Sequence, residues 1–109
     1  MTDKIIVLTT CSSEAEASEI ALYLVEQRLA ACVNILPRAQ SIYRWKEKIE
    51  ESTECLMVIK SRRDLFTSLR HQIQKLHSYE VPEVIAVPVV DGSETYLGWL
   101  DGQLANPES

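Results

Sequence analysis

Glycine is scarce in this sequence, with only 3 among 109 residues. The chain lacks a glycine-rich phosphate-binding loop, and it contains neither the Gly-x-Ser-x-Gly nor the His-Glu-x-x-His pattern of well-known hydrolases. A dyad of Cys11 and His77 could support nucleophilic chemistry, but no third residue that would orient it is evident. We therefore expect a protein that is not an enzyme.

Paired cysteines and long hydrophobic runs are also missing. Cys11, Cys32 and Cys55 are an odd number at wide spacing, so they predict neither a disulfide framework nor a zinc knuckle. No segment approaches the ~20 apolar residues of a membrane span, and the first residues lack the pattern of a signal peptide. We expect a cytoplasmic protein without a membrane span.

Positive charge is nowhere concentrated. The formal net charge is -5, and Arg62 and Arg63 form the only adjacent basic pair. Because phosphate binding needs clustered Lys and Arg, we expect no nucleic-acid partner. With 46% hydrophobic and 25% charged residues, the chain has the composition of one globular domain spanning residues 1–109.

Residues 32–60 predict two long β-strands joined by a tight turn at residues 45–48. The first arm alternates with a period of two, and we expect one side of it to carry Val33, Ile35, Ala39, Tyr43 and Trp45. Each arm would be about 45 Å long at ~3.3 Å per residue, whereas a domain of this size has a radius of gyration of ~13 Å. The hairpin should overhang its own domain, and its apolar side chains should pack against identical chains.

The other elements follow from their periodicity. Residues 5–8 and 84–90 are apolar runs typical of buried strands, and we expect helices from Ser13 to about Arg28, from Ser61 to about His77, and after Ser93. The order predicts an α+β fold, a ferredoxin-like βαββαβ sandwich with an additional C-terminal helix. Both main helices should cover one face of the sheet. The other face is apolar too, which again predicts an oligomer.

Several segments resemble one family. They are the first strand ending in Thr9-Thr10, Leu29-Ala30-Ala31-Cys32-Val33-Asn34, Ser41-Ile42-Tyr43-Arg44-Trp45, Tyr79-x-x-Pro82-Glu83 and Tyr96-x-x-Trp99. In order and spacing the chain is similar to the divalent-cation tolerance protein CutA family over about residues 4–103. The resemblance implies a homotrimer with an architecture like that of PII signalling proteins, metal-ion tolerance, and copper binding in some members.

The chain departs from the family pattern at two places. Copper-binding members resemble each other in a cysteine near the end of the first strand and a histidine pair before the Tyr-x-x-Pro-Glu segment. Here those positions carry Thr9 and the pair Leu76-His77. At the hairpin tip the family usually has glycine where this chain has Glu47, which would cost roughly 1 to 2 kcal/mol if the position requires a positive φ.

A metal site can also be inferred from the residues themselves. Copper(I) prefers thiolate or thioether ligands, and copper(II) prefers imidazole and carboxylate. Antiparallel pairing of the first and last strands should bring Cys11 close to His77 and Glu83. We therefore predict that these three bind copper or another divalent cation, and we expect no organic cofactor. Alternatively, Cys11 is an inert thiol and His77 only interacts with its helix dipole.

A second candidate site is a cleft between subunits. It would be built from Tyr43, Trp45, Lys60, Tyr79 and Glu83, with Thr9 close to Tyr79. A cation, a carboxylate and amphipathic rings could bind a small anionic or zwitterionic ligand, as in a PII-like regulatory module with a small-molecule or protein partner. Alternatively, Lys60 and Glu83 form an ion pair and the rings only pack.

Overall fold

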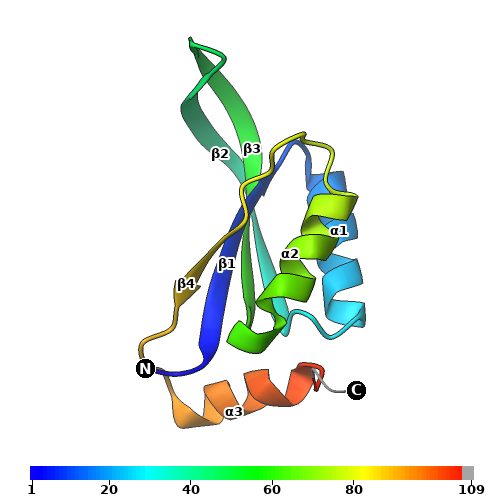
Figure 1. The fold of residues 1–109 in the computed structure, drawn as a ribbon, viewed down its shortest axis with the longest axis vertical. Helices are drawn as coiled ribbons and strands as arrows, with labels where there is room; N and C mark the ends of the chain where they lie inside the picture. The colour runs from blue at the N-terminus through cyan, green and yellow to red at the C-terminus, as the bar shows by residue number, and fades with distance from the viewer. Residues whose placement is uncertain (107–109) are drawn as a thin grey trace.

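The computed structural model describes residues 1–106 and has the predicted order of elements (Figure 1). These are β1 (Lys4–Cys11), α1 (Glu14–Glu26), β2 (Cys32–Trp45), β3 (Lys48–Arg62), a 3-10 turn (Arg63–Leu65), α2 (Phe66–Leu76), β4 (Ile85–Pro88) and α3 (Glu94–Gln103). The sheet has the strand order β2-β3-β1-β4, and every neighbouring pair is antiparallel. Helices α1 and α2 lie on one face of the sheet, which confirms the ferredoxin-like prediction.

The main core lies between the sheet and these two helices. Alternate residues of β1 and β3 face the helices, and their side chains are fully buried against apolar residues of α1 and α2. The buried set includes Val7, Cys11, Met57, Ile59, Leu24, Leu69 and Ile73. A buried aliphatic side chain contributes about 1.5 to 3 kcal/mol, so this layer holds the sheet and helices together. None of the helices in residues 1–106 is sufficiently long and apolar to cross a membrane.

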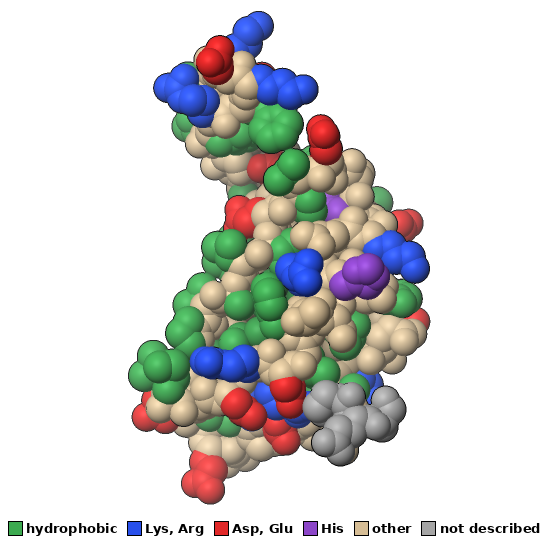
Figure 2. Space-filling model, viewed as in Figure 1, with side chains coloured by type: hydrophobic (Ala, Val, Ile, Leu, Met, Phe, Trp, Pro, Cys, Tyr) green, Lys and Arg blue, Asp and Glu red, His purple; other side chains and the backbone are tan. Residues whose placement is uncertain are grey.

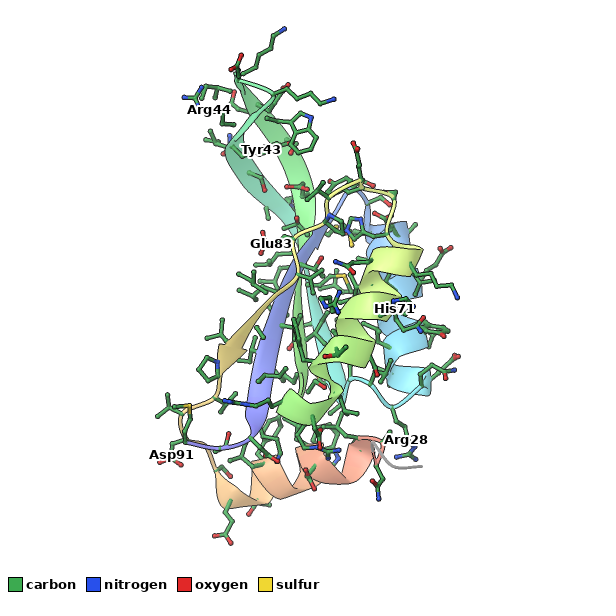
Figure 3. The ribbon with its side chains drawn as sticks, in the orientation of Figure 1. Arg28, Tyr43, Arg44, His71, Glu83 and Asp91 are labelled. Atoms are coloured by element: carbon green, nitrogen blue, oxygen red, sulfur yellow. The ribbon has the colours of Figure 1, made fainter. Side chains whose placement is uncertain are left out.

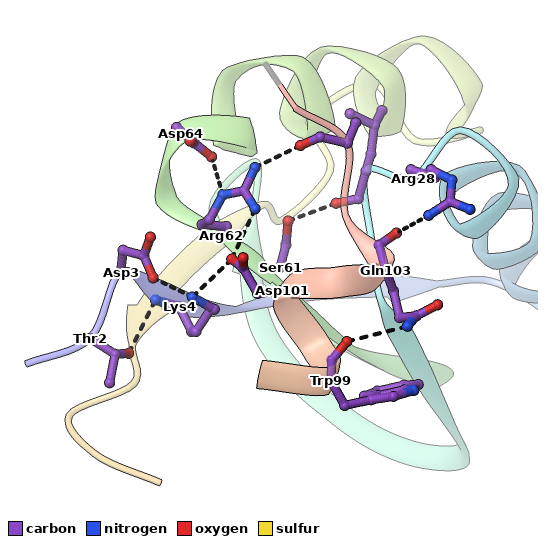
Figure 4. Close-up of polar contacts among 12 residues, drawn as sticks. Thr2, Asp3, Lys4, Arg28, Ser61, Arg62, Asp64, Trp99, Asp101 and Gln103 are labelled. Carbon is purple, nitrogen blue, oxygen red and sulfur yellow. Dashed lines mark hydrogen bonds and ion pairs between the residues drawn. The ribbon is translucent and has the colours of Figure 1, made fainter. Parts of the chain in front are cut away.

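Helix α3 lies across the end of the sheet opposite the hairpin, where a polar network anchors it (Figure 4). Arg62 Nη1 donates to Asp101 Oδ1 at 3.0 Å and Arg62 Nε donates to Asp64 Oδ1 at 2.8 Å. Lys4 Nζ lies 3.1 Å from the same Asp101 oxygen. Because Arg62 and Lys4 are both buried, these carboxylates compensate cations that would otherwise be costly.

The predicted start of the first helix is confirmed, but that of the second is wrong. Ser13 caps α1 by accepting a hydrogen bond from the Glu16 N–H. Ser61 was expected to cap the second helix, yet it lies within β3, and its hydroxyl donates to the Leu29 carbonyl at 2.6 Å. The strand continues to Arg62, and α2 begins only at Phe66 without a side-chain cap.

The hairpin of β2 and β3 extends the molecule along its longest axis, which measures 44 Å against 26 and 22 Å for the other two (Figure 1). Its two-residue turn has positive φ at both Lys46 (49°) and Glu47 (68°). These are the backbone angles of a type I′ turn, whose second position favours glycine. Glu47 therefore occupies a left-handed conformation, as its position at the family glycine predicts.

One prediction about the hairpin is wrong because β2 contains a bulge. The pairing is Leu36 with Leu56 and then Ala39 with Glu54, so β2 has one extra residue there. An extra residue exchanges the two faces of a strand. Val33 and Ile35 therefore face the core, while Tyr43 and Trp45 lie on the opposite face, which they share with Glu54.

Apolar side chains are exposed on the hairpin and along β4. Ile42 and Ile49 are 64% and 61% exposed, and Ile85 and Val87 of β4 are 51% and 45% exposed. Figure 2 shows hydrophobic side chains along the flank that carries β4. The strand expected over residues 84–90 is paired only from Ile85 to Pro88. These surfaces are the ones that the sequence predicts to be covered in an oligomer.

Candidate functional site

The first candidate site lies where β1 and α2 end. Cys11 is the last residue of β1, and His77 is the first residue after α2, with an extended backbone that ends the helix. Cys11 Sγ lies 3.7 Å from His77 Nε2 and 3.4 Å from Met57 Sδ. All three side chains are buried. The structure thus places the predicted pair together and adds the Met57 thioether, which was not predicted from the sequence as part of this site.

Two hydrogen bonds fix the orientation of the His77 ring. The backbone N–H of Tyr79 donates to Nδ1 at 3.0 Å, so this nitrogen carries a lone pair. The ring proton is then on Nε2, which donates to the Thr10 carbonyl at 2.7 Å. A metal ion bound at Nε2 requires the proton to move to Nδ1, and both hydrogen bonds would be lost.

The Cys11 thiol is protonated at neutral pH. Burial, with smaller effects from the neighbouring Glu16, Cys55 and Glu54 side chains, raises the pKa of Cys11 to about 12. Such a thiol is a poor nucleophile, because the thiolate is the reactive form. It can still bind a thiophilic metal ion, since the ion displaces the proton.

Glu16 is a further side chain at this site that could bind a metal ion, and it was not predicted from the sequence. Ligand atoms of Cys11, Glu16 and His77 all lie within 4.8 Å of one another. Burial would raise the pKa of Glu16, but hydrogen bonds from Ser78 and Ser12 lower it below its usual value. In the sequence Glu16 is explained by the capping pattern with Ser13, so a possible role as a metal ligand was not considered. Its position only five residues after the end of β1 is the signal that could have indicated it.

The two distances around Cys11 Sγ are compatible with ligands of a single metal ion. Tetrahedral ligands at 2.0 to 2.3 Å from one ion are about 3.5 Å apart, close to the 3.4 and 3.7 Å measured around Cys11 Sγ. Thiol, thioether and imidazole groups are a soft donor set that suits copper(I). Glu83, the third predicted ligand, does not belong to the group formed by Cys11, Glu16 and His77, and the other histidine, His71, lies elsewhere. Glu83 lies on the segment that leads to β4, and His71 is exposed on the outer side of α2 (Figure 3).

The second candidate site is a cavity of about 640 Å³ between the hairpin and the segment after α2. Four of the six residues predicted for a ligand cleft line it, namely Tyr43, Trp45, Tyr79 and Glu83. Glu54 and Glu80 also line it, although neither was predicted as part of the cleft. The place of Glu54 could not be recognised without the bulge in β2, which puts Tyr43 and Trp45 on the same face of the hairpin as Glu54.

Lys60 and Thr9 do not line this cavity. The Lys60 amino group lies 3.4 Å from the Tyr96 hydroxyl and 5.6 Å from the centre of the Tyr96 ring, where it interacts with α3. Thr9 is fully buried, and its hydroxyl has no hydrogen-bond partner among residues 1–106. The ion pair of Lys60 with Glu83, which was the alternative to a ligand cleft, is absent from the described part of the chain. The cavity is therefore acidic, not mixed in charge.

Known proteins resemble this chain over nearly all its length. A sequence family described as CutA1 divalent ion tolerance protein matches residues 5–103. The divalent-cation tolerance protein CutA of Thermus thermophilus is 46% identical over 95 residues, which are 87% of this chain and 92% of that protein. Protein CutA of Mus musculus is 52% identical over 91 residues, 84% of this chain. The chain spans about half the length, 51%, of the mouse and human relatives.

Solved structures agree with these sequence matches. A divalent cation tolerance protein from Thermus thermophilus has a TM-score of 0.91 and 43% identity, covering 94% of this chain and 99% of that one. The periplasmic divalent cation tolerance protein CutA from Archaeoglobus fulgidus has a TM-score of 0.89 and 38% identity, covering 92% and 97%. The same fold and much of the same sequence are shared.

Proposed function

Since the chain belongs to the CutA1 divalent ion tolerance family, we propose that it acts in metal tolerance by binding copper between Cys11 and His77. The observation that carries this proposal is the buried Cys11 thiol, which has Met57 Sδ at 3.4 Å and His77 Nε2 at 3.7 Å. These soft donors favour copper(I). Glu16 supplies a carboxylate for a harder ion such as Zn²⁺ or copper(II).

The protein acts as a binding protein and not as an enzyme. The Cys11 thiol is protonated at neutral pH because its pKa is raised to about 12, and both nitrogens of His77 are engaged in hydrogen bonds to the backbone. Neither group is prepared for nucleophilic or general-base chemistry. Metal binding requires only that the ion displace the thiol proton and the His77 ring change its tautomer.

The functional unit is a homotrimer in the cytoplasm. Exposed apolar residues on the hairpin and on β4 support self-association, and the resemblance to the family favours three subunits. Light scattering on the purified protein should give a trimer mass, and a monomer mass would contradict this part of the proposal.

Titration with copper under reducing and non-reducing conditions tests the metal site. Saturable binding is expected, strongest under reducing conditions, and both Cys11→Ser and His77→Ala should weaken it. Glu16→Gln and Glu83→Gln form a matched pair, because each removes one carboxylate and only Glu16 lies beside Cys11. Copper(II) or Zn²⁺ binding should weaken in the Glu16 variant alone. Absence of saturable binding, or binding unaffected by the Cys11 and His77 variants, would refute the proposal.

A further inference from the structure

The cavity between the hairpin and the segment after α2 carries negative charge without a compensating cation. Three carboxylates line it, those of Glu54, Glu80 and Glu83. No Lys or Arg is among the described residues that line it, and the ion pairs found in residues 1–106 all involve Lys4 or Arg62 at the opposite end of the sheet. An anionic ligand would be repelled by this lining.

Glu54 is the most informative of these residues because it is buried, with only 7% of its surface exposed. The Tyr79 hydroxyl donates to Glu54 Oε2 at 2.5 Å, and this is the only hydrogen bond of the Glu54 side chain within residues 1–106. Glu54 lines the cavity and takes part in none of the ion pairs found among residues 1–106. A buried carboxylate in this position is compensated best by a positively charged group.

Aromatic rings form the rest of the wall. Tyr43 and Trp45 lie on the same face of the hairpin as Glu54, because the bulge after Leu36 exchanges the faces of β2. Tyr79 completes the set from the other side of the cavity. The Trp45 ring already has a cation near it, since Lys46 Nζ lies 5.8 Å from its centre on the exposed tip. Aromatic faces and carboxylates together attract ammonium groups through cation–π and ionic interactions.

The size of the cavity points to an organic ligand. Its volume of about 640 Å³ falls within the usual range of roughly 300 to 1,000 Å³ for small-molecule sites. A bare metal ion would leave most of this space empty and would not use the rings. We propose that this cavity binds a small organic ammonium ion, with Glu54 as its charge partner and Tyr43, Trp45 and Tyr79 as its aromatic wall.

None of the proposed metal ligands, Cys11, Met57, His77 and Glu16, lines this cavity. The proposal of an ammonium site therefore does not rest on the proposed metal function. The ligand proposed here also differs from the anionic or zwitterionic ligand predicted from the sequence. That prediction required Lys60 in the cleft, but Lys60 faces Tyr96 on α3. The ammonium preference therefore follows from the bulge in β2 and the place of Lys60.

Isothermal titration of the metal-free protein with choline tests the proposal, and 3,3-dimethylbutan-1-ol is the matched ligand because it has the same shape without the charge. Choline should bind saturably and the neutral alcohol at least tenfold more weakly. Glu54→Gln keeps the size of the side chain and its acceptor for Tyr79 but removes the charge, so choline affinity should fall by about tenfold or more. Glu26→Gln, on the exposed surface of α1, is the control for net charge and should bind like the native protein.

A second variant guards against a folding defect in Glu54→Gln. Trp45→Leu lies at the hairpin tip, outside the core of the chain. In a variant that keeps the native mass in light scattering, loss of the ring should weaken choline binding by about threefold or more. Glycine betaine adds a carboxylate to the same ammonium group and should bind more weakly than choline. The proposal is overturned if choline does not saturate, if the neutral alcohol binds equally well, or if neither Glu54→Gln nor Trp45→Leu weakens binding.

Discussion

The affinity of the Cys11–His77 site for copper(I) should depend steeply on pH. The pKa of Cys11 is about 12, so between pH 7 and 9 nearly every protein molecule carries the thiol. Forming the thiolate at pH 7 costs about 7 kcal/mol, and each rise of one pH unit reduces this cost by about 1.36 kcal/mol. If the ion displaces this one proton, affinity should rise about tenfold per pH unit, and about a hundredfold from pH 7 to pH 9.

The slope of the logarithm of copper(I) affinity against pH also depends on whether His77 loses a proton. Its proton is on Nε2, because Nδ1 accepts the Tyr79 N–H. If the proton moves to Nδ1 when the metal binds, His77 releases no proton and the slope stays at one. Anaerobic competition with a chromophoric copper(I) chelator at pH 7, 8 and 9 measures this slope, after correction for protonation of the chelator.

Cys11→Ser is the control for the pH titration, because it should remove the pH dependence together with most of the affinity. A native protein whose copper(I) affinity is constant from pH 7 to 9 would show that the Cys11 thiol is not a ligand. A slope of two would show that His77 loses its proton entirely, which contradicts the proposed change of tautomer.

Three further predictions concern single residues. Met57→Leu keeps the core volume and should lower the unfolding free energy by less than about 1.5 kcal/mol. It should weaken copper(I) binding and leave Zn²⁺ binding unchanged. An unchanged copper(I) affinity would show that the Met57 thioether is not a ligand. Glu47→Gly removes a side chain at φ 68° and should raise the unfolding free energy by about 1 kcal/mol in chemical denaturation; a loss of stability would contradict this. Asp101→Asn should lower that free energy by about 1 kcal/mol at pH 7. Hydrogen bonds from Arg62 and Lys4 lower the pKa of Asp101, so its stabilising effect is present above its unfolded-state pKa and is lost as pH falls through the lower folded value. The difference from native should therefore shrink below about pH 4, and a constant difference would argue against the charge.

The fold could be predicted from the sequence because its signals are local and consistent. The apolar run after Lys4, the cap at Ser13 and the alternation in the hairpin each predict an element that the structure contains. Ser61 was misleading because a Ser with an acidic residue three positions later also occurs within strands. Its hydroxyl bonds the Leu29 carbonyl instead of a helix end.

The bulge in β2 could not be placed from alternation alone. Pro37 interrupts the strand and Arg38 adopts a positive φ of 60°, yet neither residue fixes by itself how the register continues. One extra residue decides whether Tyr43 and Trp45 face the core or the cavity. The lining of the cavity was therefore only partly predictable.

The candidate metal site was predictable to the extent that it depends on topology. Antiparallel pairing implied that Cys11 and His77 are close, and the structure brings them to 3.7 Å; that they bind metal stays a prediction. Met57 and Glu16 were missed because each already has an ordinary role, in the core and near a helix start. Only the three-dimensional arrangement shows that both also reach Cys11.

A crystal structure of the copper(I)-loaded protein, with anomalous data collected at the copper absorption edge, tests the central claim most directly. The account predicts one anomalous peak per chain about 2.3 Å from Cys11 Sγ and about 2.0 Å from His77 Nε2, with the His77 ring released from the Thr10 carbonyl. A copper peak bound only by surface residues, or an unoccupied Cys11–His77 site at saturating copper(I), would contradict it.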